Sequence, residues 1–338
     1  PQNRGIEALA QDLRQRAQNL PARPADGRFR MAIDRVFTLK GVGLVVTGMV
    51  FAGNARVDDT LQLSASGAQA RVRGIRVHDA PGECARAGER CALNIGGRGI
   101  DEDTLRRGDW LLHPDLRAPT RRIDVELGVL DTEPRSLKHW TPVHLHLGAE
   151  RINARVAILG GGAIAAGERG LAQLVLERDA FTLYGDRFVL RDQSARRSMA
   201  GGRVIDPFAP QRGRARPERI AALQAMNHDD PKAALEALAR SSARGVAIAS
   251  FALSRNLDAD RIEALIDATS LIPVDAAGEP RAFSPDRWER LLDCVEQAVG
   301  EFHGNRPDSP GASARDIQLA IEIHHELAAI EAAAARLV

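Results

Sequence analysis

The sequence predicts a mainly β chain that turns helical towards its C-terminus, with two β-barrels followed by winged-helix (helix-turn-helix) domains. Two observations support this fold class. Up to residue 207, short apolar strand patterns alternate with glycine or proline turns at a rhythm of about 8–12 residues, which is typical of barrels. From residue 218 the apolar residues take helical spacing, and two short helices followed by two short strands give the order of a winged helix.

Changes in pattern divide the 338 residues into five units. The first contains an amphipathic helix over residues 5–20, which the PARPADG segment then breaks. This helix is too short to form a domain, so we expect its packing partner to lie outside a chain that is a fragment. No wing pattern follows the last helix, so the second winged helix should be partial. The units are a linker helix at 1–26, a barrel at 27–120, a barrel and linker at 121–217, a winged helix at 218–284 and the partial one at 285–338.

The first barrel is organised around Arg30 to Val50, RMAIDRVFTLKGVGLVVTGMV, which predicts two strands joined by a glycine turn. The apolar positions change parity across Asp34 and Arg35, so we expect a β-bulge there. Asp58 and Asp59 should form a turn, because aspartate tolerates the left-handed conformation. Further strands of this barrel are expected at 60–63, 70–77 and 90–95.

The remaining elements follow from the same patterns. Strands of the second barrel are expected at 122–129, 142–147, 152–159, 171–176 and 187–190. Wing strands are expected around a DAAGEP turn, at 271–274 and 281–283. Trp110, Trp140 and Trp288 are interpreted as packing residues of a core or an edge. Helices are expected at 217–226, 231–241, 247–254, 258–269, 285–303 and 316–337.

Two segments carry a resemblance to a known family. IDRVFTLKGVGLVVTG resembles the start of the second domain of translational GTPases, the β-barrel that follows their nucleotide-binding domain. The adjacent Asp34 and Arg35 make it most similar to the bacterial selenocysteine-specific elongation factors. GDRFVLRDQSARRSMAGGRVIDP, from Gly185 to Pro207, resembles the third domain of the same factors. The resemblance implies two barrels like those of elongation factor Tu, in a fragment that lacks the GTPase domain.

The resemblance also implies what the whole protein does: it delivers selenocysteinyl-tRNA to the ribosome at UGA codons in the cytoplasm, using GTP, Mg and a selenocysteine-directing mRNA hairpin. This chain would supply the tRNA-binding barrels and the first winged-helix region. Two alternatives stay open. Another tRNA-binding translational GTPase, of the elongation factor Tu or initiation factor type, is not expected to continue into winged helices. A winged-helix nucleic-acid-binding regulator is disfavoured by the two barrels and by the acidic recognition helix at 258–269.

Asp34, Arg35 and Arg90 are the candidate pocket for the aminoacyl end of the tRNA, as the resemblance implies. Selenocysteine ionises at a lower pH than cysteine, whereas its precursor serine carries no charge. Two guanidinium groups would therefore favour a selenolate, and Asp34 could orient one of them. The alternative interpretation of the same residues is a surface ion pair beside a solvated arginine, worth about 0–1 kcal/mol.

Charge along the sequence indicates where nucleic acid would bind. Residues 121–217 contain 16 basic and 11 acidic residues, whereas 285–338 contain 5 and 10. The β-rich middle is therefore the expected nucleic-acid surface, although such an excess is also common on solvated faces. The candidates for contacts with the tRNA backbone are Arg71, Arg73, Arg76, Arg187, Arg191, Arg196, Arg197 and Arg203.

Several kinds of chemistry have no motif in this sequence. No G-x-x-x-x-G-K-[ST] loop is present, and the GGGAIAAG segment at 160–167 lacks the lysine, so we expect this chain alone neither to bind nor to hydrolyse GTP. The three cysteines have no metal spacing, and His144 and His146 are interpreted as packing or solvent-facing side chains. We therefore predict no metal and no cofactor in this chain. No apolar run approaches the ~18–20 residues of a membrane span.

Overall fold

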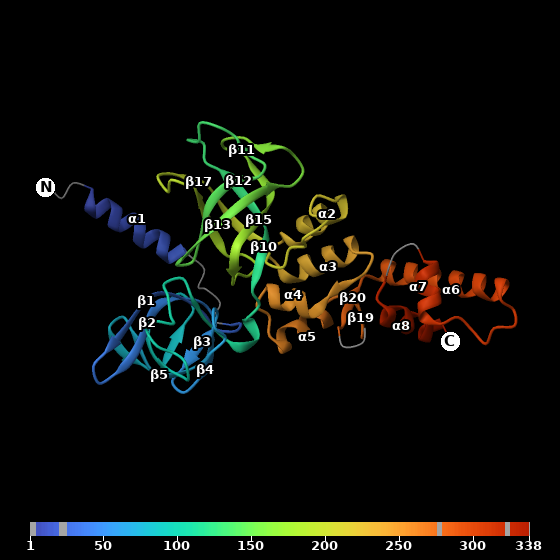
Figure 1. Cartoon of the computed structure of the whole chain (residues 1–338), viewed down its shortest axis with the longest axis horizontal. Helices are drawn as coiled ribbons and strands as arrows, with labels where there is room; N and C mark the ends of the chain where they lie inside the picture. The colour runs from blue at the N-terminus through green and yellow to red at the C-terminus, as the bar shows by residue number, and fades with distance from the viewer. Residues whose placement is uncertain (1–4, 20–25, 276–278, 322–324, 338) are drawn as a thin grey trace.

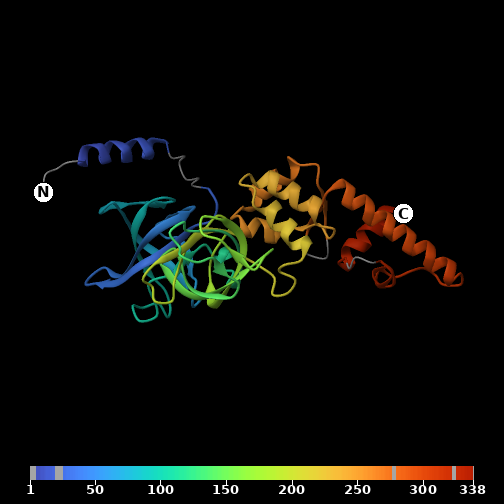
Figure 2. The ribbon, with the colours of Figure 1, turned by 90° about the horizontal axis from the view of Figure 1, so that it is seen from above.

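The computed structural model describes residues 5–19, 26–275, 279–321 and 325–337. Two β-barrels lie next to each other, a helical domain packs beside them, and the last three helices form the far end of the molecule (Figure 1). The view from above shows that the whole arrangement is elongated (Figure 2). This architecture confirms the predicted fold class, mainly β and then α.

The first barrel is a closed ring of antiparallel strands. Its strands are β1 (Arg30–Leu39), β2 (Gly43–Ala52), β4 (Thr60–Leu63), β5 (Gln69–Val77), β8 (Arg90–Gly96) and β9 (Trp110–Leu112), with shorter strands at β3 (Asn54–Arg56), β6 (Ala80–Gly82) and β7 (Cys84–Arg86). The order is β4-β9-β1-β2-β8-β5, and the pairing of β4 with β5 closes the ring. Fully buried Ile33, Val46 and Leu93 belong to the core inside it.

The hairpin of β1 and β2 contains the predicted bulge. Ile33 pairs with Gly48 and Arg35 pairs with Thr47, so Asp34 is the extra residue on β1. A bulge re-aims the side chains that follow it and bends the strand locally. The side chains of Asp34 and Arg35 therefore do not follow the regular alternation of the strand on either side of the bulge.

The second barrel is a closed six-stranded ring with a two-stranded ribbon attached to it. Its order is β10-β15-β13-β12-β16-β17, and the ribbon pairs β11 with β14. A core of aliphatic side chains fills the ring. The elements are β10 (Thr120–Val129), β11 (Leu137–Lys138), β12 (Thr141–Leu147), β13 (Glu150–Ile158), β14 (Ala163–Ile164), β15 (Arg169–Ala180), β16 (Arg187–Arg191) and β17 (Ser198–Asp206).

The helical domain beside the barrels has the connectivity of a winged helix. Helix α2 comes first in the chain. A small three-stranded sheet follows, in the order β18-β20-β19, and the other helices of the domain pack on it. The DAAGEP turn of the predicted wing lies partly outside the described residues. The elements are α2 (Pro217–Met226), α3 (Pro231–Ser241), β18 (Val246–Ala247), α4 (Ile248–Ser254), α5 (Ala259–Asp267), β19 (Ile272–Val274) and β20 (Arg281–Phe283).

The C-terminal helices differ from the prediction of one helix over 316–337. The structure has α6 (Pro285–Asn305), α7 (Ala314–Ala320) and α8 (Leu327–Leu337). Helix α7 ends because Ile321 takes an extended backbone conformation, with φ −87° and ψ 140°. Ending the helix there lets α8 turn back, so that Ile317 and Ile330 pack with α6 in one apolar cluster.

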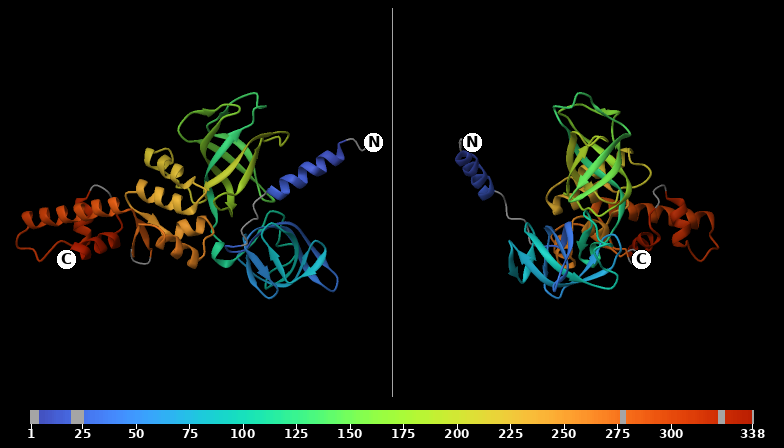
Figure 3. Two further views of the ribbon diagram at one scale, coloured as in Figure 1. Left: turned by 180° about the vertical axis from the view of Figure 1, so that it is seen from behind. Right: turned by 60° about the vertical axis from the view of Figure 1, so that its left-hand side comes forward.

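Helix α1 (Ile6–Asn19) stands away from both barrels when the molecule is seen from above (Figure 2) and in the right-hand view of Figure 3. None of its residues is buried. Ile6, Leu9 and Leu13 keep 60%, 59% and 56% of their surface exposed, although they form the predicted apolar face. This face therefore has no packing partner among the described residues, and predicted Leu20 lies outside them.

Buried ion pairs connect the units of the fold. Arg30 of the first barrel forms two hydrogen bonds, of 2.7 and 3.0 Å, with Asp186 of the second barrel. Arg219 of α2 bonds Asp124, at 2.9 Å from Nε, and Asp206, at 2.6 Å, both in the second barrel. Breaking such a pair leaves an uncompensated buried charge, so these contacts hold the two barrels and the helical domain together.

Candidate functional site

Asp34 and Arg90 meet at the bulge of the first barrel, as the prediction requires. Arg90 is the first residue of β8, where it pairs with Met49 of β2. Its guanidinium donates two hydrogen bonds to the Asp34 carboxylate, one of them 3.0 Å long from Nη2 to Oδ1. The Asp34 side chain is 22% exposed and that of Arg90 49%. The pair is thus open to solvent and to a ligand.

Thr47, which was not among the predicted residues, also contacts Asp34. Its hydroxyl donates a hydrogen bond of 2.8 Å to Asp34 Oδ1. Thr47 lies on β2 opposite Arg35, which is itself exposed and carries the second positive charge next to the bulge. Counting cross-strand pairs outward from the glycine turn at 41–43 would have placed Thr47 opposite Arg35. Asp34 therefore has a fixed orientation between a hydroxyl and a guanidinium.

The electrostatics of the site favour its charged forms. Partial burial raises the pKa of Asp34, but the hydrogen bonds from Arg90 and Thr47 and the charges of Arg90 and Arg35 lower this pKa below its usual value overall. The hydrogen bond to Asp34 raises the pKa of Arg90. Three charged groups, two positive and one negative, thus sit together, and the net positive field suits an anionic ligand group.

The three candidate arginines of β5 are exposed but differ in their partners. Arg71 makes an ion pair of 2.9 Å with Asp58, which has the left-handed φ of 76° expected of this turn. Arg76 donates to the backbone oxygen of Asp79. Arg73 crosses over Gly96, where an added Cβ would meet its guanidinium carbon at 2.4 Å. Among these three, Arg73 has the guanidinium that no carboxylate or carbonyl of the described chain engages.

The candidates on the second barrel fall at two ends of the β16–β17 hairpin. Arg191, Arg196 and Arg197 lie around its tip, where the Asp192 carboxylate accepts the backbone N–H groups of Arg196 and Arg197 at 2.9 and 3.1 Å. Arg197 also lies 3.4 Å from the buried carboxylate of Glu133. The tip is therefore an ordered cluster of arginines.

Arg187 and Arg203 pair with each other across the opposite end of the same hairpin. Arg203 bonds the backbone oxygen of Asn227 at 3.1 Å and makes an ion pair with Asp229, both after α2. It therefore contacts the helical domain, and the Tyr184 ring lies 6.0 Å from its guanidinium carbon. For the eight candidate arginines together, contact with a tRNA backbone stays a prediction.

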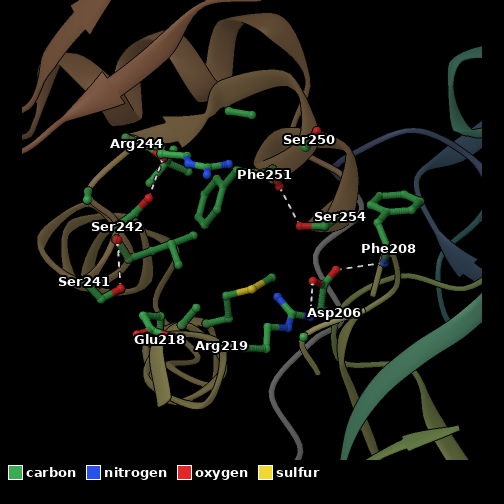
Figure 4. Close-up of a pocket in the computed structure, with 18 of the residues that line it drawn as sticks. Asp206, Phe208, Glu218, Arg219, Ser241, Ser242, Arg244, Ser250, Phe251 and Ser254 are labelled. Atoms are coloured by element: carbon green, nitrogen blue, oxygen red, sulfur yellow. Dashed lines mark hydrogen bonds and ion pairs between the residues drawn. The ribbon is translucent and has the colours of Figure 1, made fainter. Parts of the chain in front are cut away.

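A cavity of about 840 Å³ lies between the second barrel, its linker and the winged helix. Figure 4 shows Asp206 and Arg219 on one side of it and Phe251, Ser242 and Arg244 on the other. On its barrel side the Arg219 guanidinium is paired with Asp206. The cavity could not be predicted from the sequence, because it depends on how two units pack.

Two features are absent from the part of the chain that the structure describes. The described residues contain no group of three or more His, Cys, Asp or Glu side chains that could hold a metal ion. His144 instead lies 2.8 Å from the side-chain oxygen of Asn153 and 3.0 Å from the backbone oxygen of Gln193. No helix within the described ranges is long and apolar enough to cross a membrane.

Two adjoining closed barrels, a polar site at the bulge of the first one and a winged helix after the second define a class: translation elongation factors with a C-terminal extension. Family models agree with this architecture. Residues 43–112 match elongation factor Tu domain 2. Residues 120–211 match the β-barrel domain of the selenocysteine-specific elongation factor.

The chain belongs to the family of selenocysteine-specific elongation factors. It is 36% identical over 316 residues to the factor of that name from Escherichia coli, covering 92% of this chain and 47% of the relative. It is 33% identical over 301 residues to the one from Desulfomicrobium baculatum, covering 86% and 46%. The chain thus spans about half the length of the curated relatives it matches.

Solved structures show the same fold. A bacterial selenocysteine-specific elongation factor superposes with a TM-score of 0.70 at 17% identity, covering 98% of this chain and 51% of that one. The apo form of translation elongation factor SelB from Methanococcus maripaludis gives a TM-score of 0.51 at 23% identity, over 61% of this chain and 49% of that one. At these identities the superpositions speak for the fold alone.

Proposed function

We propose that this chain is the aminoacyl-tRNA-binding part of a selenocysteine-specific elongation factor, which delivers selenocysteinyl-tRNA to the ribosome at UGA codons in the cytoplasm. The observation that carries the proposal is the similarity to factors of that name along 92% of the chain. The continuation from the second barrel into a winged helix favours these factors over elongation factor Tu, to which 37% of the chain is similar.

The site at the bulge gives this proposal its chemistry. Arg35 and Arg90 present two permanent positive charges, and Asp34 holds Arg90 in place. A selenolate next to them gains a charge–charge attraction that the neutral hydroxyl of serine lacks. The pocket would therefore distinguish the selenocysteinyl ester from its seryl precursor by charge rather than by size.

Other partners belong to the proposed whole protein. GTP and Mg would act in a GTPase domain, and this sequence contains no phosphate loop that fits them, so no residue here is assigned to either. The selenocysteine-directing mRNA hairpin is a further proposed partner. The acidic α5, with Asp260, Glu263 and Asp267 and with Asp258 as its N-cap, makes the first winged helix a poor candidate for binding it.

The test is the substitution Arg90→Ala, studied in the factor together with its GTP-loaded GTPase domain. It should weaken the binding of selenocysteinyl-tRNA about tenfold or more, because it removes one partner of a charge pair that the ligand desolvates. The binding of seryl-tRNA should change much less. Dissociation constants for both tRNAs, measured by protection of the aminoacyl ester from hydrolysis, give the comparison.

Arg73→Ala is the matched control on the same barrel, because the Arg73 guanidinium is uncommitted among the described residues. If it contacts phosphate, its loss should weaken both tRNAs alike and reduce the salt dependence of binding. Equal weakening of both tRNAs by Arg90→Ala would instead make Arg90 a general tRNA contact and would place the selenolate pocket elsewhere.

A further inference from the structure

Trp140 lies at an exposed edge, unlike the other two tryptophans. Trp110 and Trp288 are 1% and 8% exposed, whereas Trp140 is 42% exposed. Its φ of 65° is in the left-handed region, which bulky residues rarely adopt. Its amide nevertheless bonds the Val156 carbonyl oxygen at 2.6 Å, which fixes the backbone. An outlier that the surrounding structure holds in place is a reason to look for function.

Positive groups surround the exposed indole. The guanidinium carbons of Arg214 and Arg155 lie 5.6 and 5.9 Å from its ring centroid, and Arg155 also bonds the Trp140 carbonyl oxygen at 3.4 Å. Lys138 is a close neighbour in the chain. Within the described ranges, none of these three cations forms an ion pair with a carboxylate. Their charge is therefore available to an anionic partner.

The surface beside the indole is open. The His139 ring stacks on Trp140, with centroids 6.0 Å apart and planes 24° from parallel. The backbone N–H of His139 bonds the carbonyl oxygen of Gly162 at 3.0 Å. Cβ atoms added at the three glycines of 160–162 would meet nothing within 4 Å. The glycine loop beside the indole therefore leaves open space for a partner.

We propose that Trp140, Arg155 and Arg214 form a binding site for an unpaired nucleobase of RNA. The base stacks on the indole, and the two guanidinium groups attract the adjacent phosphates. A base inside a duplex does not expose its face, so the site selects single-stranded segments, loops or flipped nucleotides. RNA is the partner that uses both features together, because a base stacks on the indole while its phosphates meet the two guanidinium groups.

This site goes beyond the proposed discrimination at Arg90 and does not depend on it. The unpaired base could come from the loops of a tRNA, from a messenger loop or from ribosomal RNA, and these sources share the same chemistry. Sequence preference should be weak, because every base has a face that can stack. Arg214 comes from the linker before α2, so the site joins the linker to the second barrel.

The experiment uses tryptophan fluorescence, because a stacked base quenches the exposed indole while the two buried tryptophans stay unaffected. An unstructured RNA of about ten nucleotides should quench the fluorescence, whereas a blunt RNA duplex of the same length should not. Adding an unacylated tRNA and a loop-containing RNA hairpin as separate arms shows which source reaches the site.

Trp140→Gly is the decisive variant, because glycine suits the left-handed φ and the change should not unfold the barrel. It should weaken binding of fluorescein-labelled single-stranded RNA about tenfold or more, measured by anisotropy. Trp140→Phe, which retains an aromatic face, should keep most of the affinity. Leu130→Ala, at an equally exposed apolar residue of the same barrel, should keep all of it. Arg155→Ala and Arg214→Ala should weaken binding and reduce its salt dependence.

Unchanged RNA affinity of Trp140→Gly would overturn the proposal. Equal binding of the duplex and the single strand would do so as well, because it would mean phosphate attraction without stacking. Loss of ribosome binding in Trp140→Gly with unchanged oligonucleotide affinity would assign this surface to a protein partner instead. These outcomes leave the Arg90 comparison untouched, so the two proposals can fail separately.

Discussion

Glu150 is a carboxylate enclosed at the contact between the two barrels. It makes an ion pair with Arg178, and its side chain is 6% exposed. Its Oε2 atom has no hydrogen-bond partner among the described residues. A Cβ added at Gly108 of the first barrel would lie 3.1 Å from the Cα, Cβ and Cγ atoms of Glu150. Burial raises the pKa of Glu150 to about 7, although Arg178 opposes this effect. The charged form of this residue is therefore the disfavoured one.

This raised pKa predicts the pH dependence of stability at the barrel contact. Between the ordinary value of 4.5 and about 7, the folded chain binds a proton that the unfolded chain has lost. The stability contributed by Glu150 is therefore present below pH 4.5 and is lost as the pH rises towards 7. The gap between the two pKa values corresponds to about 3 kcal/mol.

Glu150→Gln, which is neutral at every pH, should be more stable than the parent at pH 8 by up to about 3 kcal/mol. The difference should shrink towards zero at pH 4.5. Urea unfolding at several pH values measures it, with the exposed Glu177→Gln as a control that should show no such trend. A variant that is less stable than the parent at pH 8 would show that the pairing with Arg178 outweighs the burial of the charge.

At the scale of elements, two adjacent glycines show why β17 was not expected from its sequence. Gly201 and Gly202 have low strand propensity, and they interrupt the apolar alternation of SMAGGRVID. In the barrel, a Cβ at Gly202 would lie 2.0 Å from the backbone oxygen of Glu126 on β10. The close approach of β17 to β10 requires glycine at this position. The same glycine lowers the strand propensity of the segment, which is why the strand was not predicted.

Gly202→Ala should therefore destabilise the second barrel by about 1–3 kcal/mol or more, because the strand pair must separate to accept the methyl group. Gly201→Ala is the matched control one residue away. Its added Cβ would lie 3.3 Å from the Phe188 oxygen, a tight but tolerable contact. Thermal unfolding of both variants compares them, and similar melting temperatures would mean that β17 can shift without loss.

The long strands and helices could be predicted from the sequence because their apolar periodicity extends over several residues. The helices at 217–226 and 231–241 have the predicted bounds. The ribbon strands of two or three residues, such as β11 and β14, are too short to show a period. The break between α7 and α8 was missed because the apolar spacing continues through it, and only the fold of α8 back onto α6 shows it.

The candidate site was predictable in part for a similar reason. Asp34 and Arg35 stand next to a change of parity, and Arg90 begins a strand, so local pattern and family resemblance located all three. Thr47 was missed because its role depends on cross-strand register. Which tryptophans lie in a core and which at an edge could not be predicted, because exposure depends on what the tertiary structure leaves uncovered, and the sequence neighbours of Trp140 do not show that.

At the scale of the whole molecule, arginines bridge all three main units. Arg30 reaches from the first barrel to Asp186 of the second, and it also lies 4.7 Å from the centroid of the Trp110 ring. The Arg255 guanidinium from the winged helix lies 3.8 Å from the Tyr184 ring centroid. It donates hydrogen bonds of 2.6 and 2.8 Å to the backbone oxygens of Met226, the last residue of α2, and of His228. Buried or half-buried arginine side chains thus connect the barrels and the winged helix at several points through non-covalent contacts.

A single asparagine connects the winged helix to the start of the first barrel. Asn256, in the turn between α4 and α5, has a left-handed φ of 55° and is 8% exposed. Its side chain accepts from the backbone N–H of Arg28 and donates to the Arg28 carbonyl oxygen, both at 2.9 Å. An added Cβ at Gly27 would lie 2.9 Å from Asn256 Nδ2, so the approach requires glycine. This contact therefore ties the winged helix directly to the residues that precede β1.

Asn256→Ala should release this contact, because it removes both hydrogen bonds and leaves two polar groups of Arg28 without protein partners. The cost is about 1–3 kcal/mol for this junction, and it should appear locally rather than in the barrel core. Hydrogen exchange of a peptide covering 27–34 should speed up in the variant, while peptides from β10 and β13 keep the parent rate. Asn227→Ala is the control, because Asn227 also bridges two units, through a bond of 3.2 Å to Glu126, but does not touch Arg28. If exchange at 27–34 is the same in Asn256→Ala as in the parent, the ion pair of Arg261 with Asp26 and the Arg28 bond to the Leu257 oxygen hold the junction without the asparagine.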